Sequence, residues 1–281
     1  MSITPYRVPV VPKIKRDNYI KLYEKGFRTD ERDFYTPRKI CIKTNVLEKA
    51  NGSSLVKLGN TTILAGIKIE LGQPYPDTPN EGVLQVHAEL SPLASSLFEP
   101  GPPDENSIEL SRVIDRSLRD PKVIDFNSLI INPGNKAWVI WIDLYALDYD
   151  GNLFDASMLA TMSALYTARM PELEELETGE IKIKNKVSNK PIKINKRIVS
   201  VTTAKIGKYI IVDPNLDEEI ISDTRSVLVF DEEGNIVGAQ KTGMGSYTME
   251  EINNTIEISS KASQVYFKLL EEALENEKLE R

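Results

Sequence analysis

One segment, KAWVIWIDLYALD at 136–148, constrains the fold of this chain more than any other. It is apolar at both odd and even positions, whereas a strand with one face in water alternates apolar and polar side chains. The segment therefore predicts a strand that is covered on both faces. A turn at Tyr149–Asn152 follows, and then FDASMLATMSALYTARM, whose alanine, serine and methionine side chains predict a helix packed closely against a sheet.

The segments before and after this unit predict two similar halves. Residues 1–30 predict an N-terminal arm and a short helix that Gly26 ends, and residues 31–170 predict a first half of strands and helices. One of these strands is expected near 123–131. The charged stretch 171–192 predicts an exposed connector.

Residues 193–281 predict the second half, in which four strands precede a long C-terminal helix. Thr248 and Glu251 have the spacing of a capping box at the start of that helix. Each half is thus a meander of strands followed by a helix. The predicted fold class is α+β, with helices packed on mostly antiparallel or mixed sheets.

The helix predicted after Pro102 and Pro103 carries three arginines on one side. Asp104 is a suitable N-cap, and an apolar stripe follows at helical spacing. Arg112, Arg116 and Arg119 fall within a narrow arc opposite that stripe. A row of guanidiniums at this spacing can follow a phosphate backbone. The alternative is a solvated helix face, in which Glu109, Asp115 and Asp120 pair with the arginines.

Composition excludes several classes of enzyme. The chain has one histidine, His87, and one cysteine, Cys41, so a Cys/His zinc site lacks ligands, and a Ser–His or Cys–His triad would require His87 to serve alone. His87 lies in VLQVHAEL, which predicts a strand, and a packed or surface role is expected for it. No carboxylate cluster predicts a metal site, and no cofactor is expected.

Charge and hydropathy bear on partners and location. The net charge of −7 means that nucleic acid could be held only through a local positive patch. No apolar run approaches the roughly 20 residues that span a bilayer, so no membrane partner is expected. The single cysteine and the absence of an export signal predict a cytoplasmic protein.

Three stretches together resemble the RNase PH-like proteins of the exosome. GFRTDER at 26–32 is similar to the family's opening motif, with Glu31 where glycine is usual. PGPPDENSIELSRVIDRSLRD at 100–120 is similar to its proline–glycine turn and following helix. DYDGNLFDASMLA at 148–160 lies where the family has a strand-to-helix phosphate loop. The resemblance implies an RNase PH-like fold from about residue 20 onward.

The departures from the family pattern point to a subunit without turnover of its own. Catalytic members carry Gly-Ser-Arg at the phosphate loop, where this chain has Gly151, Asn152 and Leu153. Leucine cannot pair with phosphate, so phosphorolysis loses a group that holds its nucleophile. Glu105 and Asn106 likewise stand where catalytic members carry an arginine pair. Asp223 matches the family's general acid and is expected to be a vestige, so no catalytic residue is predicted.

This pattern is similar to the non-catalytic RNase PH-like subunit of the archaeal exosome core. The resemblance implies a hexameric ring with a catalytic RNase PH-like partner, RNA-binding cap proteins and single-stranded RNA as substrate of the complex. Arg112, Arg116 and Arg119 are the residues expected to hold RNA. The alternative is an active phosphate-dependent 3′-5′ exoribonuclease, which Leu153 disfavours. A small-molecule kinase would need a better phosphate loop than this chain has.

Two further motifs have a structural and a functional interpretation. The turn at 243–246 could cradle a phosphate before the last helix, but a plain strand-to-helix connection is the stronger expectation. Arg28, Asp30 and Arg32 could contact RNA, and ion pairing within or between subunits is the stronger expectation for them.

Overall fold

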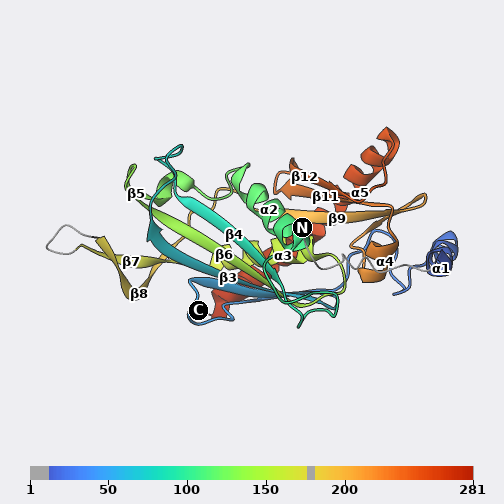
Figure 1. Ribbon diagram of the computed structural model, residues 1–281, viewed down its shortest axis with the longest axis horizontal. Coiled ribbons are helices and arrows are strands. Elements are labelled where there is room, and N and C mark those ends of the chain that lie inside the picture. The colour runs from blue at the N-terminus through green and yellow to red at the C-terminus, as the bar shows by residue number, and fades with distance from the viewer. Residues whose placement is uncertain (1–12, 176–180, 281) are drawn as a thin grey trace.

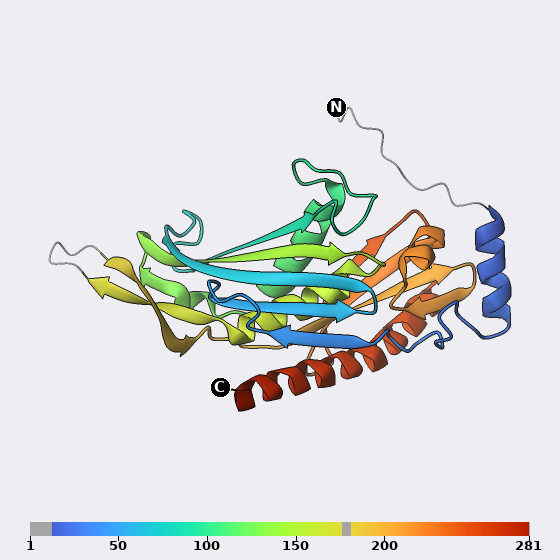
Figure 2. The ribbon, with the colours of Figure 1, turned by 90° about the horizontal axis from the view of Figure 1, so that it is seen from below.

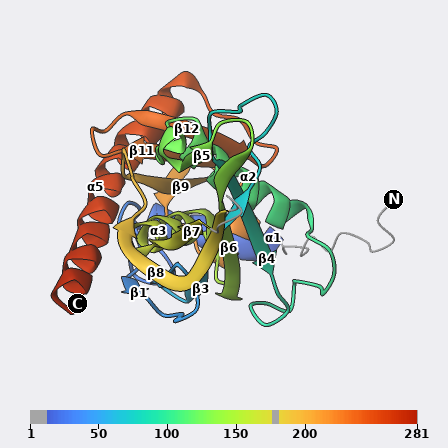
Figure 3. The ribbon, with the colours of Figure 1, turned by 90° about the vertical axis from the view of Figure 1, so that its left-hand side faces the viewer.

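Two β-sheets with helix α3 between them form the body of the protein in the computed structural model, which describes residues 13–175 and 181–280 (Figures 1 and 3). The first sheet contains, in spatial order, β1 (Ile40–Thr44), β2 (Gly52–Leu58), β3 (Thr61–Gly72), β6 (Lys136–Asp148) and β4 (Val83–Leu90), with the short β5 (Ile130–Asn132) paired to β6. The second contains β10 (Tyr209–Val212), β9 (Ile198–Ile206), β11 (Thr224–Asp231) and β12 (Ile236–Thr242).

The helices fill the space between the sheets and flank them. They are α1 (Lys13–Glu24), α2 (Glu105–Arg119), the 3₁₀ helix η1 (Phe126–Leu129), α3 (Leu153–Thr167), α4 (Leu216–Ile221) and α5 (Met249–Glu280). A two-stranded hairpin, β7 (Arg169–Glu175) and β8 (Ile181–Pro191), projects from the end of the molecule opposite α1 (Figure 2). β4 runs parallel to β6, whereas the other pairings of the described strands are antiparallel. The α+β class with mixed sheets is therefore confirmed.

Helix α3 packs closely against the first sheet, as its small side chains predict, and it is also buried on its other sides. β2 approaches it so closely that a Cβ at Gly52 would overlap the carbonyl oxygen of Ala164. The Ser54 hydroxyl donates a hydrogen bond of 2.6 Å to the carbonyl oxygen of Ala160. One hydrophobic core runs through both sheets and α5, so the predicted boundaries between the halves stay predictions.

Three segments differ from the sequence-based expectation. The predicted strand at 123–131 is wrong over most of its length, because the backbone N–H and hydroxyl of Ser128 both bond to the Asp125 carbonyl and close the turn of η1. Helix α4 was not expected, although Asn215 and Glu218 form its capping box. The predicted connector contains the β7–β8 hairpin, whose tip lies outside the described residues.

The prediction that β6 is covered on both faces is confirmed for only part of the strand. Ala137 to Ile140 are buried at both parities, whereas Trp141 and Asp143 are half-buried and Tyr145 is exposed. Helices α2 and α3 cover one face of the first sheet. Within the described residues, no helix covers the other face, and none is both long and apolar enough to cross a membrane.

Candidate functional site

Helix α2 begins and packs as the sequence predicts. The Asp104 carboxylate accepts a 2.8 Å hydrogen bond from the backbone N–H of Ser107, which satisfies a free donor of the first turn. Leu110, Ile114 and Leu118 are buried against the core. The opposite side of α2 is therefore turned toward solvent, and it carries the three arginines.

The three arginines of α2 differ in how firmly they are held. Arg112 is exposed and makes no hydrogen bond or ion pair with the described residues. The Arg116 side chain is 75% exposed and lies 3.3 Å from the Asp120 carboxylate. Arg119 is pinned by Asp115 at 2.7 Å and by the carbonyl oxygen of Leu84 at 2.9 Å. Arg112 and Arg116 are thus available to an external anion, and Arg119 is less so.

The turn that begins α3 has a backbone that only certain residues tolerate. Gly151 has φ +81°, and a Cβ there would lie 2.6 Å from the backbone nitrogen of Leu216. Asn152 has φ 56° and caps α3, with its side-chain oxygen accepting from the backbone N–H of Asp155. Asparagine tolerates this left-handed conformation better than most residues. The turn is therefore built for tight contact with the segment that precedes α4.

The side chain of Glu219, from α4, occupies this turn. Its carboxylate accepts hydrogen bonds from the backbone N–H of Asn152 at 3.0 Å, the Tyr149 hydroxyl at 2.8 Å and the Arg225 guanidinium at 2.5 Å. The side chain is only 6% exposed. The N-terminus of a helix attracts anions through its free N–H groups and its dipole. In this chain, the anion is an internal carboxylate.

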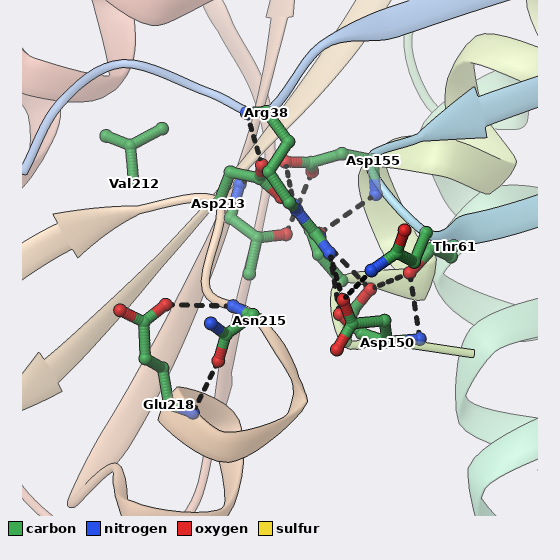
Figure 4. Close-up of polar contacts among 12 residues, drawn as sticks. Arg38, Thr61, Asp150, Asp155, Val212, Asp213, Asn215 and Glu218 are labelled. Carbon is green, nitrogen blue, oxygen red and sulfur yellow. Dashed lines mark hydrogen bonds and ion pairs between the residues drawn. The ribbon is translucent and has the colours of Figure 1, made fainter. Parts of the chain in front are cut away.

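Two further carboxylates lie beside the turn (Figure 4). Burial favours the neutral form of Asp213, but the Arg38 guanidinium, at 2.7 and 2.9 Å, holds the pKa of Asp213 below its ordinary value. Asp155 is fully buried, and burial raises its pKa to about 6 against the hydrogen bonds of Asn152 and Thr202. Three carboxylates therefore surround the start of α3, where a phosphate dianion would meet repulsion.

The arginines of the GFRTDER motif serve the fold. Arg28 and Glu218 form an ion pair with both side chains fully buried, and Arg28 also donates to the Val212 carbonyl at 2.9 Å. Arg32 donates to Asp30 at 2.7 Å. The structural interpretation of this motif is therefore confirmed for contacts within the chain. Sequence reasoning missed their partners Glu218 and Asp213, and also Arg38, because those contacts join residues more than 100 positions apart.

Asp223, the predicted vestige of a general acid, is fully engaged. Its carboxylate accepts from Arg16 of α1 at 2.7 and 2.8 Å and from the backbone N–H of Gly207 at 2.7 Å. Its carbonyl oxygen accepts from Gly245 in the turn at 243–246 at 2.8 Å. The first turn of α5 is capped by Thr248 and Glu251, as predicted. Asp223 and the turn at 243–246 are thus both held by contacts within the chain.

His87 lies on the exposed side of β4, where its ring stacks on Trp141 with 5.8 Å between centroids. No group of three or more histidine, cysteine, aspartate or glutamate side chains is arranged to hold a metal ion in the described part of the chain. These observations place the chemistry of interest at two sites. One is the outer side of α2, and the other is the turn that begins α3.

Two family models match parts of this chain. Residues 36–171 match the model of the 3′ exoribonuclease family, domain 1, and residues 196–262 match domain 2 of that family. The chain belongs to the RNase PH family of 3′ exoribonucleases. Its fold and the order of its motifs are those of this family.

Individual members extend the match over nearly the full length. The exosome complex component Rrp42 of Aeropyrum pernix is 59% identical over 274 residues, which are 98% of this chain and 99% of that protein. Rrp42 of Sulfurisphaera tokodaii is 45% identical over 98% of this chain and 99% of its own. A chain of the Archaeoglobus fulgidus exosome with RNA bound to the active site superposes with a TM-score of 0.82 and 41% identity, covering 91% of this chain and 97% of that one.

Proposed function

We propose that this RNase PH family member is a structural and RNA-guiding subunit of an archaeal exosome, without turnover of its own. It completes a hexameric ring with a catalytic RNase PH-like partner and supports the partner's 3′-5′ phosphorolytic degradation of RNA. RNA-binding cap proteins complete the complex, which acts in the cytoplasm. Relatives called exosome components, at 45% and 59% identity over nearly the whole chain, support the assignment to this complex.

The observation that carries the absence of turnover is the occupancy of the α3 turn. Phosphorolysis needs inorganic phosphate held beside the scissile bond. Here the N–H of Asn152 already bonds to Glu219, and Leu153 offers no donor side chain. Asp155 and Asp213 add buried carboxyl groups beside the turn. A dianion would have to displace Glu219, which would break the partly buried ion pair between Glu219 and Arg225.

The observation that supports RNA guidance is the solvent exposure of Arg112 and Arg116. Both guanidiniums are exposed on a helix whose other side is fixed in the core. Contacts of this kind bind phosphate groups and carry no base information. The subunit would therefore hold RNA of any sequence near the partner's active site, and Arg119 would act mainly within the helix.

Activity assays with the subunits apart and together test the proposal. The isolated chain should neither release nucleoside diphosphates from poly(A) in phosphate nor extend RNA from nucleoside diphosphates. Co-expression with a catalytic RNase PH-like subunit should give one complex by light scattering, with more activity than that subunit alone. Phosphate-dependent shortening of RNA by the isolated chain would instead establish the alternative, an active exoribonuclease.

A further inference from the structure

Arg112 has two acidic neighbours on its own helix. Glu109 precedes it by three positions and Asp115 follows it by three, and residues at this spacing are adjacent on the surface of a helix. Either carboxylate could therefore pair with the Arg112 guanidinium and neutralise it. Arg112 nevertheless makes no hydrogen bond or ion pair with the described residues. The contacts that the two carboxylates make elsewhere account for its exposure.

Both carboxylates are turned toward the flanks of α2. The helix lies between β4 on one flank and β12 on the other (Figure 1). On the β4 flank, Asp115 accepts hydrogen bonds from Arg119 at 2.7 and 3.2 Å, and Arg119 also donates to the carbonyl oxygen of Leu84. On the β12 flank, the Glu109 carboxylate accepts a hydrogen bond of 3.0 Å from the side-chain amide of Gln240. Each carboxylate is thus paired on its own flank of the helix.

The backbone of β12 places Gln240 where it can hold Glu109. Gln240 lies opposite Val227 of β11, and its side chain reaches α2 from the face of the second sheet that the helix covers. Gly238 is two positions earlier in the strand and therefore lies on the same face. A Cβ at Gly238 would lie 3.6 Å from the hydroxyl oxygen of Ser117 on α2. The contact between Gln240 and Glu109 is therefore supported by close packing of the strand on the helix.

Arg225 of β11 attracts Glu109 in the same direction. The pKa of Arg225 is raised chiefly by the Glu219 carboxylate, and the Glu109 carboxylate adds to this effect. The Arg225 side chain is only 28% exposed, so solvent screens its charge less than that of a fully exposed arginine. Gln240 is neutral and donates to Glu109 without competing with Glu219 for Arg225. Glu109 is therefore drawn toward the second sheet and away from Arg112.

We propose that Gln240 is a positioning residue for RNA guidance, which keeps Glu109 from pairing with Arg112. This inference rests on the proposed function. Without the amide donor, the Glu109 carboxylate turns along the helix and forms the ion pair with Arg112 that their spacing allows. An RNA phosphate then has to displace a carboxylate to reach the Arg112 guanidinium. A neutral side chain on β12 therefore decides whether this arginine of α2 is open to RNA.

Gln240→Glu tests this role, because a carboxylate in place of the amide repels Glu109 toward Arg112. Rings with this variant should bind single-stranded RNA about threefold or more weakly, and the slope of log affinity against log salt should be shallower by up to about 0.7, the value for one lost phosphate contact. Gln240→Met, which removes the donor without adding a charge, should weaken binding in the same direction. Light scattering and circular dichroism would show that both variants assemble and fold.

Two further combinations separate positioning from a general effect of charge. Adding Glu109→Gln to Gln240→Glu exchanges the two groups, so the net charge is that of the wild type and an amide on α2 can donate to a carboxylate on β12. This exchange should restore RNA affinity. In an Arg112→Ala background, Gln240→Glu should have no further effect, whereas long-range repulsion of RNA or a structural defect would weaken binding in both backgrounds.

The remaining outcomes separate this inference from the proposed function. Unchanged RNA affinity in Gln240→Glu, equal losses with and without Arg112, or no recovery in the exchanged pair would each overturn the inference, while the proposed function stands. If Arg112→Ala by itself left RNA affinity unchanged, the RNA-guiding part of the proposed function would fail, and this inference would fail with it. The same follows if the wild-type chain forms no ring with a catalytic RNase PH-like subunit.

Discussion

The carboxylate of Glu219 accepts a hydrogen bond of 3.0 Å from the backbone N–H of Asn152, the residue that caps α3. The two residues are 67 positions apart in the sequence, and their contact joins the turn between β6 and α3 to helix α4. The N-terminus of α3 is therefore occupied by a carboxylate from the same chain. The same carboxylate forms a partly buried ion pair with Arg225.

The first prediction concerns the free energy that this carboxylate contributes. Glu219→Gln keeps the shape of the side chain but leaves Arg225 without its counter-ion. Breaking a largely buried pair in this way should lower the free energy of unfolding by roughly 3 kcal/mol, measured by urea denaturation. Glu232→Gln is the control, because Glu232 pairs with Arg197 at the surface, where such pairs contribute about 0–1 kcal/mol. Equal effects of the two substitutions would contradict the prediction.

The second prediction concerns the arginines of α2. Replacing Arg112 and Arg116 with alanine should leave ring assembly intact and lower the affinity of the ring for single-stranded RNA. The slope of log affinity against log salt should become shallower by about 0.7 for each lost phosphate contact. Binding would be measured over a salt series for wild-type rings, the double variant and a control with alanine at Lys261 and Lys268 on α5. An unchanged slope in the double variant would mean that α2 presents only a solvated face.

The third prediction concerns pH. The pKa of Asp155 is raised to about 6, so between about pH 4 and 6 the unfolded chain releases this proton while the folded chain keeps it. Stability should therefore fall as pH rises through this window, by roughly 3 kcal/mol from Asp155 alone. Asp143, whose pKa is also raised, acts in the same direction, whereas Asp213, whose pKa is lowered, contributes its change below about pH 4.

Urea midpoints of the wild-type chain at pH 4.5 and pH 6.5, chosen as roughly the two ends of this window, would check this prediction. The midpoint should be lower at the higher pH. Asp155→Asn should flatten most of the dependence, because asparagine does not titrate. A pH dependence of the midpoint that is the same in the wild-type chain and in Asp155→Asn would show that Asp155 does not have a raised pKa.

The fourth prediction concerns the glycine of the α3 turn. Gly151→Ala combines a left-handed backbone with a Cβ that would lie 2.6 Å from the Leu216 backbone nitrogen. Gly134→Ala is the matched control, because Gly134 has φ +71° and open space around it. The control should cost about 1–2 kcal/mol for the left-handed conformation. Gly151→Ala should cost more, as measured by the shift in thermal midpoint, and equal losses would show that the turn can open.

The amino-acid sequence by itself determined the local elements and the family. Periodicity and capping residues predicted α2 and α5, and the small residues of α3 predicted its close packing against a sheet, because these patterns depend on neighbours within one or two turns. The motifs at 26–32, 100–120 and 148–160 identified the RNase PH family. Leu153, which stands where the resemblance implies an arginine, predicted that this turn lacks a cationic side chain for phosphate.

Tertiary structure decided which charged side chains are exposed to solvent and which are paired within the chain. The sequence already set Arg119 apart from Arg112, because Asp115 can pair with it, but only the fold shows that the carbonyl oxygen of Leu84 also holds Arg119 from 35 positions away. Glu219 and Asp213 had no local signal, since their partners are brought together only when α4 packs against the α3 turn. The fold likewise decided which face of the first sheet α2 and α3 cover, because a strand pattern records that a face is to be buried but not what covers it.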